Sequence, residues 1–157
     1  MKDDAVILDA ACGSKMFWFE RDNPDVLFID IRKEEHILCD GREFKINPDV
    51  IMDFTNMEFP DRRFKLIVFD PPHLNTLGKS SWMAKKYGVL PEDWKPIIKD
   101  GLNECWRVLA KDGVLIFKWS DVDIKVSDVL KLVNFKPLFG HRTMINNRTI
   151  WLCFMKI

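Results

Sequence analysis

The chain has 157 residues, of which 47% are hydrophobic and 31% charged; this composition fits one globular domain and excludes a disordered or fibrous protein. Its 24 basic and 24 acidic residues give a net charge of zero, which argues against a uniformly basic nucleic-acid-binding protein but leaves room for a local basic patch. The scattered cysteines lack metal-ligand and disulfide-framework spacing, so we expect reduced thiols, no metal and a cytoplasmic protein; they are Cys12, Cys39, Cys105 and Cys153.

Neither end of the chain nor its interior suggests membrane association. No apolar run approaches the roughly 18 residues that a membrane-spanning helix needs. The N-terminal MKDDAVILDAACGS carries acids before a short apolar run, unlike a signal peptide.

Short apolar runs predict the strands of a parallel sheet that is buried on both faces. They span 5–10, 26–31, 49–54, 65–70 and 113–119. The first four end at or near an acid, namely Asp9, Asp30, Asp53 and Asp70. Because the carboxyl ends of parallel strands share one edge, where open α/β sheets bind ligands, these acids mark a candidate site.

Helical signals are weak early in the chain. Residues 14–21 can form only a short helix before the breaking sequence DNP, and residues 32–48, with Gly41 and Pro48, predict a short helix plus a loop.

Later segments give clearer patterns. Residues 95–113 predict a helix that stops at Gly113, because apolar side chains recur at three- and four-residue spacing: Ile98, Leu102, Cys105, Trp106 and Leu109. Residues 125–133 predict a shorter helix, and residues 137–157 predict two strands joined by an Asn-Asn turn.

The turn LDAACGS (8–14) has small residues that let a ligand approach the backbone. Only Gly13 is glycine, so a plain strand-to-helix turn is the alternative. Asp30 follows at about the 20-residue distance at which an acid on the next strand accepts hydrogen bonds from ribose hydroxyls; the alternative is a solvated strand-end carboxylate.

Two longer stretches, VIMDFTNMEFPDRRFKLIVFDPPH (50–73) and GLNECWRVLAKDGVLIFKW (101–119), resemble class I S-adenosylmethionine-dependent methyltransferases. The resemblance runs from Val6 to about Trp119 and departs at Ala11, where that family usually has glycine. It implies a Rossmann-like α/β domain over residues 1–157. The implied sheet is mostly parallel and seven-stranded, with the order 3-2-1-4-5-7-6 and a terminal antiparallel hairpin.

The same resemblance implies S-adenosylmethionine as cofactor, with S-adenosylhomocysteine as product. The turn after the first strand would line its methionine and ribose, Asp30 would hold the ribose hydroxyls, and Asp53 would accept from the adenine amino group. The implied cofactor-binding residues are Asp9, Ala10, Ala11, Cys12, Gly13, Asp30, Ile31, Asp53, Phe54 and Asp70.

The sequence DPPH, formed by Asp70, Pro71, Pro72 and His73, resembles the Asp/Asn-Pro-Pro-aromatic motif of methyltransferases that act on exocyclic amino groups of adenine or cytosine. The Asp70 carboxylate and the Pro71 carbonyl can accept both N–H groups of an amino group. Proline fixes φ, so that carbonyl is held rigidly and orients the nitrogen toward the methyl group. His73 takes the place of the ring that stacks on the flipped base; the alternative for DPPH is a rigid turn.

Residues 74–94 follow this motif and mix lysines with aromatic residues, a composition that suits nucleic-acid contact and equally a lid packed on the core. With Lys118 at the end of the fifth strand, the candidate acceptor-binding residues are Lys79, Trp82, Lys85, Lys86, Tyr87 and Lys118. The overall resemblance is closest to small stand-alone methyltransferases of bacterial or phage type, which lack a separate target-recognition region. Specificity would then come from 74–94, from 32–48, from a homodimer or from a partner protein.

Three readings stay open beside a methyltransferase acting on DNA or RNA bases. The acceptor can be a small molecule or a protein, or the chain can be a catalytically inactive binding subunit. A nucleotide-binding oxidoreductase is the third, but the sequence lacks GxGxxG.

Overall fold

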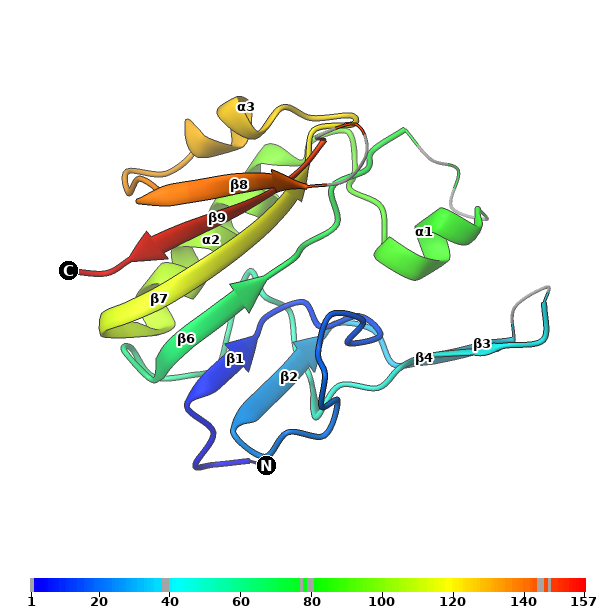
Figure 1. The fold of residues 1–157 in the computed structure, drawn as a ribbon, viewed down its shortest axis with the longest axis horizontal. Helices are drawn as coiled ribbons and strands as arrows, with labels where there is room; N and C mark the ends of the chain where they lie inside the picture. The colour runs from blue at the N-terminus through cyan, green and yellow to red at the C-terminus, as the bar shows by residue number, and fades with distance from the viewer. Residues whose placement is uncertain (1, 38–39, 77, 79–80, 144–145, 147) are drawn as a thin grey trace.

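The computed structural model describes residues 2–37, 40–76, 78, 81–143, 146 and 148–157. Its centre is a seven-stranded sheet with the spatial order β5-β2-β1-β6-β7-β9-β8 (Figure 1). These strands are β1 (Ile7–Asp9), β2 (Val26–Asp30), β5 (Val50–Ile51), β6 (Phe64–Phe69), β7 (Leu109–Ser120), β8 (Phe139–Thr143) and β9 (Thr149–Met155). Numbered in chain order within the sheet, they give 3-2-1-4-5-7-6. The first five are parallel and β9 runs antiparallel to β7 and β8, so the predicted fold class is confirmed.

The register of the central strands sets the level of each strand-end acid. Asp9 of β1 lies opposite Phe28 of β2 and Val68 of β6. Asp30 follows Phe28 by two residues, and Asp70 follows Val68 by two. Both therefore stand at the carboxyl edge of the sheet, while Asp9 lies two residues deeper. All five residues of β2 are buried, as expected for an inner strand covered on both faces.

Helix α2 (Lys95–Val108) packs on the sheet and ends earlier than predicted. Leu109 is extended, with φ −72° and ψ 129°, and starts β7. Gly113 therefore lies inside β7 rather than at the end of the helix. A Cβ there would stand 3.0 Å from the Lys65 carbonyl of neighbouring β6, so glycine allows close strand contact.

Two predicted helices are wrong. Residues 14–21 form turns, because Lys15 has φ 56°, in the left-handed region that interrupts a helix. In place of the helix predicted within 32–48, two segments pair as antiparallel strands, β3 (Glu34–Ile37) and β4 (Glu43–Ile46), which we call the β3–β4 hairpin. In β4 the side chains of Phe44 and Ile46 are buried and alternate with exposed ones, which is the period of a strand.

The remaining elements follow the predictions more closely. Helix α3 (Val126–Leu130) lies within the predicted 125–133, and β8 and β9 form the predicted terminal hairpin. Asn147, half of the predicted Asn-Asn turn, lies outside the described residues. The insert 74–94 contains a short helix, α1 (Trp82–Tyr87).

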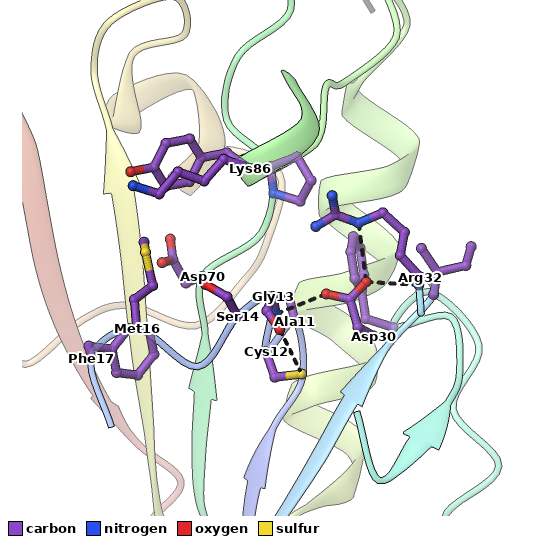
Figure 2. Close-up of a pocket in the computed structure, with 14 residues that line it drawn as sticks. Ala11, Cys12, Gly13, Ser14, Met16, Phe17, Asp30, Arg32, Asp70 and Lys86 are labelled. Atoms are coloured by element: carbon purple, nitrogen blue, oxygen red, sulfur yellow. Dashed lines mark hydrogen bonds and ion pairs between the residues drawn. The ribbon is translucent and has the colours of Figure 1, made fainter. Parts of the chain in front are cut away.

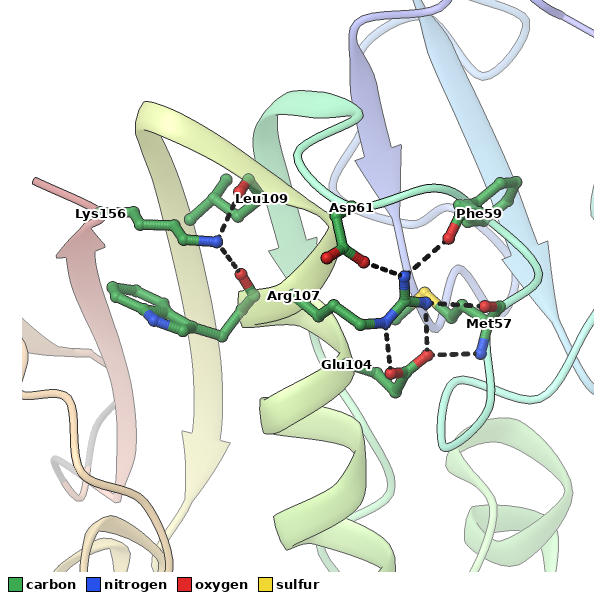
Figure 3. A network of polar contacts seen from close by, with 8 residues as sticks. Met57, Phe59, Asp61, Glu104, Arg107, Leu109 and Lys156 are labelled. Atoms are coloured by element: carbon green, nitrogen blue, oxygen red, sulfur yellow. Dashed lines mark hydrogen bonds and ion pairs between the residues drawn. The ribbon is translucent and has the colours of Figure 1, made fainter.

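A polar network fastens the loop between β5 and β6 to α2 (Figure 3). The Arg107 guanidinium donates to the carbonyls of Met57 and Phe59, at 2.8 Å each, and pairs with Asp61 and Glu104. Glu104 in turn accepts from the Met57 N–H at 2.7 Å. The loop that begins at the edge of the sheet is thus held by side chains from the helix beneath it.

No helix in the described part of the chain is both long and apolar enough to cross a membrane.

Candidate functional site

A pocket opens at the carboxyl edge of β1, β2 and β6, beneath α1 (Figure 2). The turn after β1, the ends of β2 and β6, the loop after β5 and the last residues of α1 each contribute to it. Its lining residues are Ala11, Cys12, Gly13, Ser14, Met16, Phe17, Asp30, Ile31, Arg32, Phe54, Asp70, Pro72, Lys86 and Tyr87. Most of the residues predicted to bind a cofactor are in this set; Asp9, Ala10 and Asp53 are not.

Asp30 joins the turn after β1 to the end of β2. Its Oδ2 accepts from the Gly13 N–H and its Oδ1 from the Arg32 N–H, both at 2.9 Å. The Arg32 guanidinium adds an ion pair at 3.4 Å. A carboxylate oxygen has two acceptor positions, so Oδ2, which has one partner here, can still receive a hydroxyl from a bound ligand, whereas Oδ1 already has two partners from Arg32.

Asp9 is fully buried and serves the structure beneath the pocket. Its Oδ2 accepts from Trp18 Nε1 at 2.7 Å and its Oδ1 from the Ala11 N–H at 3.3 Å. Burial raises the pKa of this carboxyl to about 7, with smaller contributions in the same direction from Asp70 and Asp30. Trp18 also packs edge-on against Phe28, 5.3 Å between ring centroids, so Asp9 anchors the segment that follows the turn.

Asp53 lies outside the pocket lining. It is exposed, and its Oδ1 accepts from the N–H and the hydroxyl of Thr55, both at 2.8 Å. Its neighbour Phe54 lines the pocket instead and meets Phe69 edge-on.

Asp70 lines the pocket, and one of its carboxylate oxygens is paired with Lys118. Its Oδ2 lies 2.5 Å from Lys118 Nζ, and both side chains are mostly buried, 15% and 21% exposed. The Lys118 ammonium also lies 5.8 Å from the Phe17 ring and 5.6 Å from the Trp151 ring. Lys118 was predicted to contact an acceptor; the structure places it beside Asp70.

His73 is not among the residues that line the pocket, whereas Pro72 is. The imidazole packs near Tyr87 and Trp119, 6.1 Å from each ring centroid. Burial is the largest cause that lowers the pKa of His73, with a smaller effect from Lys118, which keeps the ring neutral near pH 7. Within the described part of the chain, its buried Nδ1 has no hydrogen-bond partner. The ring that faces the pocket next to DPPH is that of Tyr87.

Arg32 connects the pocket floor to α1 and was not predicted from the sequence. It pairs with Asp30 and donates through Nη1 to the Lys85 carbonyl at 2.9 Å. Gly88, which caps α1 with φ 74°, lies against Pro72, where a Cβ would approach the ring Cγ to 2.9 Å. Helix α1 is thus seated directly on the DPPH segment.

The pocket is narrow in this conformation. Its volume of about 80 Å³ is well below the roughly 300–1,000 Å³ of typical small-molecule sites. Because Lys86 and Tyr87 of α1 form one wall, a nucleoside-sized ligand requires side chains that line the pocket to rearrange.

The other candidate acceptor residues are less close to the pocket. Lys79 lies outside the described residues. Lys85 contributes its carbonyl to Arg32, and Trp82 contacts Phe44 of β4. No group of three or more His, Cys, Asp or Glu side chains among the described residues could hold a metal ion.

Sequence reasoning missed Met16 and Phe17 as well as Arg32. The available signal was the apolar run MFWF (16–19), directly after a turn that was predicted to bind a ligand. Its side chains stay at least partly exposed there, with Phe17 36% and Met16 46% exposed.

No family model matches the sequence, and a search of curated proteins gives no match. Solved structures with the same fold are numerous. A TehB-like SAM-dependent methyltransferase (SAM is S-adenosylmethionine) from Corynebacterium glutamicum is 20% identical, with a TM-score of 0.61 over 98% of this chain and 81% of that one. An rRNA methylase from Streptococcus thermophilus is 12% identical, with a TM-score of 0.54 over 99% of this chain and 89% of that one.

A third similar structure is a geranyl diphosphate methyltransferase in complex with GPP and sinefungin, 7% identical, with a TM-score of 0.58 over 99% of this chain and 72% of that one. At such identities the similarity establishes the fold alone. The chain has the fold of SAM-dependent methyltransferases, as the resemblance in its sequence implied.

Proposed function

We propose that this protein binds S-adenosylmethionine in the pocket and transfers its methyl group to an exocyclic amino nitrogen of a nucleic-acid base. The observation that carries the proposal is the position of Asp70. It stands at the carboxyl end of β6, in the lining of the same pocket as the Ala11–Ser14 turn and Asp30. A carboxylate that can orient an amino group therefore adjoins the part of the fold that suits a nucleoside.

The residues of the pocket fit the cofactor in type. The small side chains of Ala11 and Gly13 let its methionine part approach the backbone, and Asp30 retains acceptor capacity for ribose hydroxyls. Ile31 and Phe54 provide apolar surface for the adenine ring. When bound, the cofactor supplies an electrophilic methyl group on its sulfonium.

Asp70 and the Pro71 carbonyl then hold the acceptor amino group. Lys118 occupies one oxygen of Asp70, so the other oxygen is available to an amino N–H. These hydrogen bonds strengthen as the nitrogen gains positive charge during attack, and stabilise the transition state more than the ground state. The nitrogen loses its proton only after the methyl arrives, when the cationic N-methyl group is acidic enough to give that proton to water, so no strong base is needed. Because Tyr87 lines the pocket and His73 does not, we expect Tyr87 to be the ring that contacts the acceptor.

The class of acceptor is inferred from the surroundings of the pocket and from one structure of similar fold. One structure of similar fold is an rRNA methylase, and lysines and aromatic residues flank the pocket. We expect DNA or RNA as acceptor, with specificity supplied by α1, the β3–β4 hairpin, a second copy of this chain or a partner protein. A small-molecule acceptor is the competing outcome, and labelled S-adenosylmethionine with separate DNA, RNA and metabolite pools tests between them.

Substitution of Asp70 tests the mechanism. We expect Asp70→Ala to lower single-turnover methyl transfer by about a hundredfold or more, while calorimetry shows nearly unchanged affinity for S-adenosylhomocysteine. Asp70→Asn should be milder, because its amide oxygen still accepts.

Two results would contradict this mechanism. If Asp70→Ala transferred methyl groups at the wild-type rate, DPPH would be only a rigid turn. If the wild-type protein bound no S-adenosylhomocysteine at millimolar concentration, the proposed cofactor would be wrong.

His73→Phe should stay active, since a packed neutral ring needs no proton; its inactivity in a folded protein would point to proton transfer.

A further inference from the structure

A second hollow adjoins the pocket, between α1 and the β3–β4 hairpin. Its volume is about 430 Å³, and it shares Ser14, Met16 and Lys86 with the pocket. We call it the hairpin groove. In Figure 1, α1 and the hairpin extend beyond the same edge of the sheet, so the groove leads away from the proposed site of methyl transfer.

Two aromatic side chains form one wall of the hairpin groove. Trp82 of α1 and Phe44 of β4 both line it. Their centroids are 5.4 Å apart and their planes 76° apart. Phe44 is 7% exposed and supports the indole, whereas Trp82 remains 40% exposed. An indole braced on one side and open on the other is a platform on which an unpaired base can stack.

The charge of the groove is unlike that of the whole molecule. Four cationic side chains line it against the single acid Glu43, although the chain has no net charge. The cations are Arg21, Arg42, Lys45 and Lys86.

Two of these cations already have acidic neighbours. Arg42 pairs with Asp40 at 2.6 Å, and Lys45 with Glu43 at 3.2 Å and Glu35 at 3.7 Å. Both cations are about half exposed or more, at 49% for Lys45 and 77% for Arg42. Solvent weakens such exposed pairs, so a phosphate can compete for these cations at little cost.

We propose that the hairpin groove binds the nucleotides flanking the target base of a single-stranded nucleic acid, with Trp82 stacking on a base and Arg21 and Lys86 contacting phosphates. This inference rests on the proposed function and adds the form of the substrate. A base must leave its stack to reach Asp70, and a single strand meets that requirement without unpairing. The chemistry of the groove, an open aromatic ring between cations, is the one that binds single strands with little sequence preference.

The test measures binding of fluorescein-labelled ten-nucleotide single strands, RNA and DNA, by anisotropy with saturating S-adenosylhomocysteine. With two to four phosphate contacts, affinity should fall roughly 7- to 50-fold between 50 and 200 mM salt. Arg21→Glu/Lys86→Glu should weaken binding at 50 mM salt by about tenfold or more and flatten the salt dependence.

Matched variants distinguish the loss of strand binding at the groove from a general effect of charge and from a loss of folding. Lys99→Glu/Lys131→Glu makes the same charge change at an exposed lysine of α2 and at one that directly follows α3, and should bind strands nearly as the wild type does. Trp82→Ala should lose about tenfold in affinity, whereas Trp82→Phe should recover most of it, because phenylalanine still stacks. Circular dichroism and thermal unfolding confirm that each variant is folded, and neither measurement depends on Lys86, which also lines the cofactor pocket.

Equal losses in the two double variants, or tighter binding of a duplex than of either single strand, would overturn the inference. In that case intact methyl transfer to free nucleosides would leave the proposed function standing. Conversely, groove-dependent strand binding by a wild type that transfers no methyl group would support the groove and overturn the proposed function.

Discussion

At the scale of single residues, three carboxylates of one sheet edge have different surroundings because of small differences in position. Asp30 and Asp70 reach the pocket lining, while Asp9 lies two residues deeper and is fully buried. Asp30 is held by backbone N–H groups, Asp70 by an ammonium, and Asp9 by an indole N–H. Their roles therefore follow from depth rather than from residue type.

The burial of Asp9 predicts a pH dependence of stability. Its pKa is raised from 3.8 to about 7 by burial, so between these values the folded protein holds a proton that the unfolded chain has lost. The free energy of unfolding should therefore fall by about 1.4 kcal/mol per pH unit as pH rises through this window, and level off above it. Urea denaturation of wild type and Asp9→Asn from pH 5 to 8 measures the effect. Parallel curves for the two proteins would show that Asp9 does not titrate there.

The Lys118–Asp70 pair predicts that Lys118 positions the carboxylate. Lys118→Met keeps a long apolar side chain near Phe17 and Trp151 but removes the ammonium. We expect single-turnover methyl transfer to fall by about tenfold to a hundredfold, because a small misplacement of a group that orients the acceptor is costly. Cofactor affinity should not change. Lys111→Met, at an exposed site of the same strand, is the matched control, and equal rates for both variants would exclude the positioning role.

At the scale of elements, α1 supplies one wall of the pocket through Lys86 and Tyr87. It is only six residues long, too short to be stable alone, so its contacts with the rest of the fold decide its position. Ser81 caps its start, Gly88 its end, and Arg32 binds the Lys85 carbonyl. These contacts hold α1 over the pocket.

Gly88→Ala should unseat α1. The new Cβ would be forced into a left-handed φ and to 2.9 Å from the Pro72 ring, so the helix should shift off DPPH. Hydrogen exchange of the α1 amides should accelerate by about tenfold, corresponding to roughly 1.4 kcal/mol of lost local stability. Gly41→Ala is the control, because Gly41 has φ +82° but nothing within 4 Å of a new Cβ. Unchanged α1 exchange in Gly88→Ala would show that Pro72 does not seat the helix.

At the scale of the whole molecule, ligand binding should be visible as stability. S-adenosylhomocysteine at 100 times its dissociation constant should add about 2.7 kcal/mol to the free energy of unfolding. For a chain of this size that is a rise in melting temperature of roughly 5–10 °C. Asp30→Ala should lose most of the rise at the same ligand concentration, because its charge-assisted hydrogen bonds to the ribose are gone. Asp128→Ala, an exposed control on α3, should keep it, and a full rise in Asp30→Ala would contradict the ribose contact.

The sequence alone determined the sheet and the edge where the site lies. Runs such as VLFID and IVFD predict inner parallel strands, because such strands are covered on both faces and read as continuous apolar runs. An acid at the end of such a run must come near the edge. Combined with the family resemblance, this was enough for the strand order and for placing Asp30, Asp70 and the small-residue turn together.

Tertiary structure decided what depends on contacts between distant segments. The hairpin at 34–46 was misread because two four-residue strands give too short an alternation, and Phe44 is fixed by packing against Trp82, far along the chain. Three further contacts likewise join residues that are 14 to 53 positions apart in the sequence. They are the packing of His73 near Tyr87, the pairing of Lys118 with Asp70 and the hydrogen bond from Arg32 to the Lys85 carbonyl. The direction of a side chain depends on the space that its packed neighbours leave, and a local sequence pattern does not show which distant residues those neighbours are.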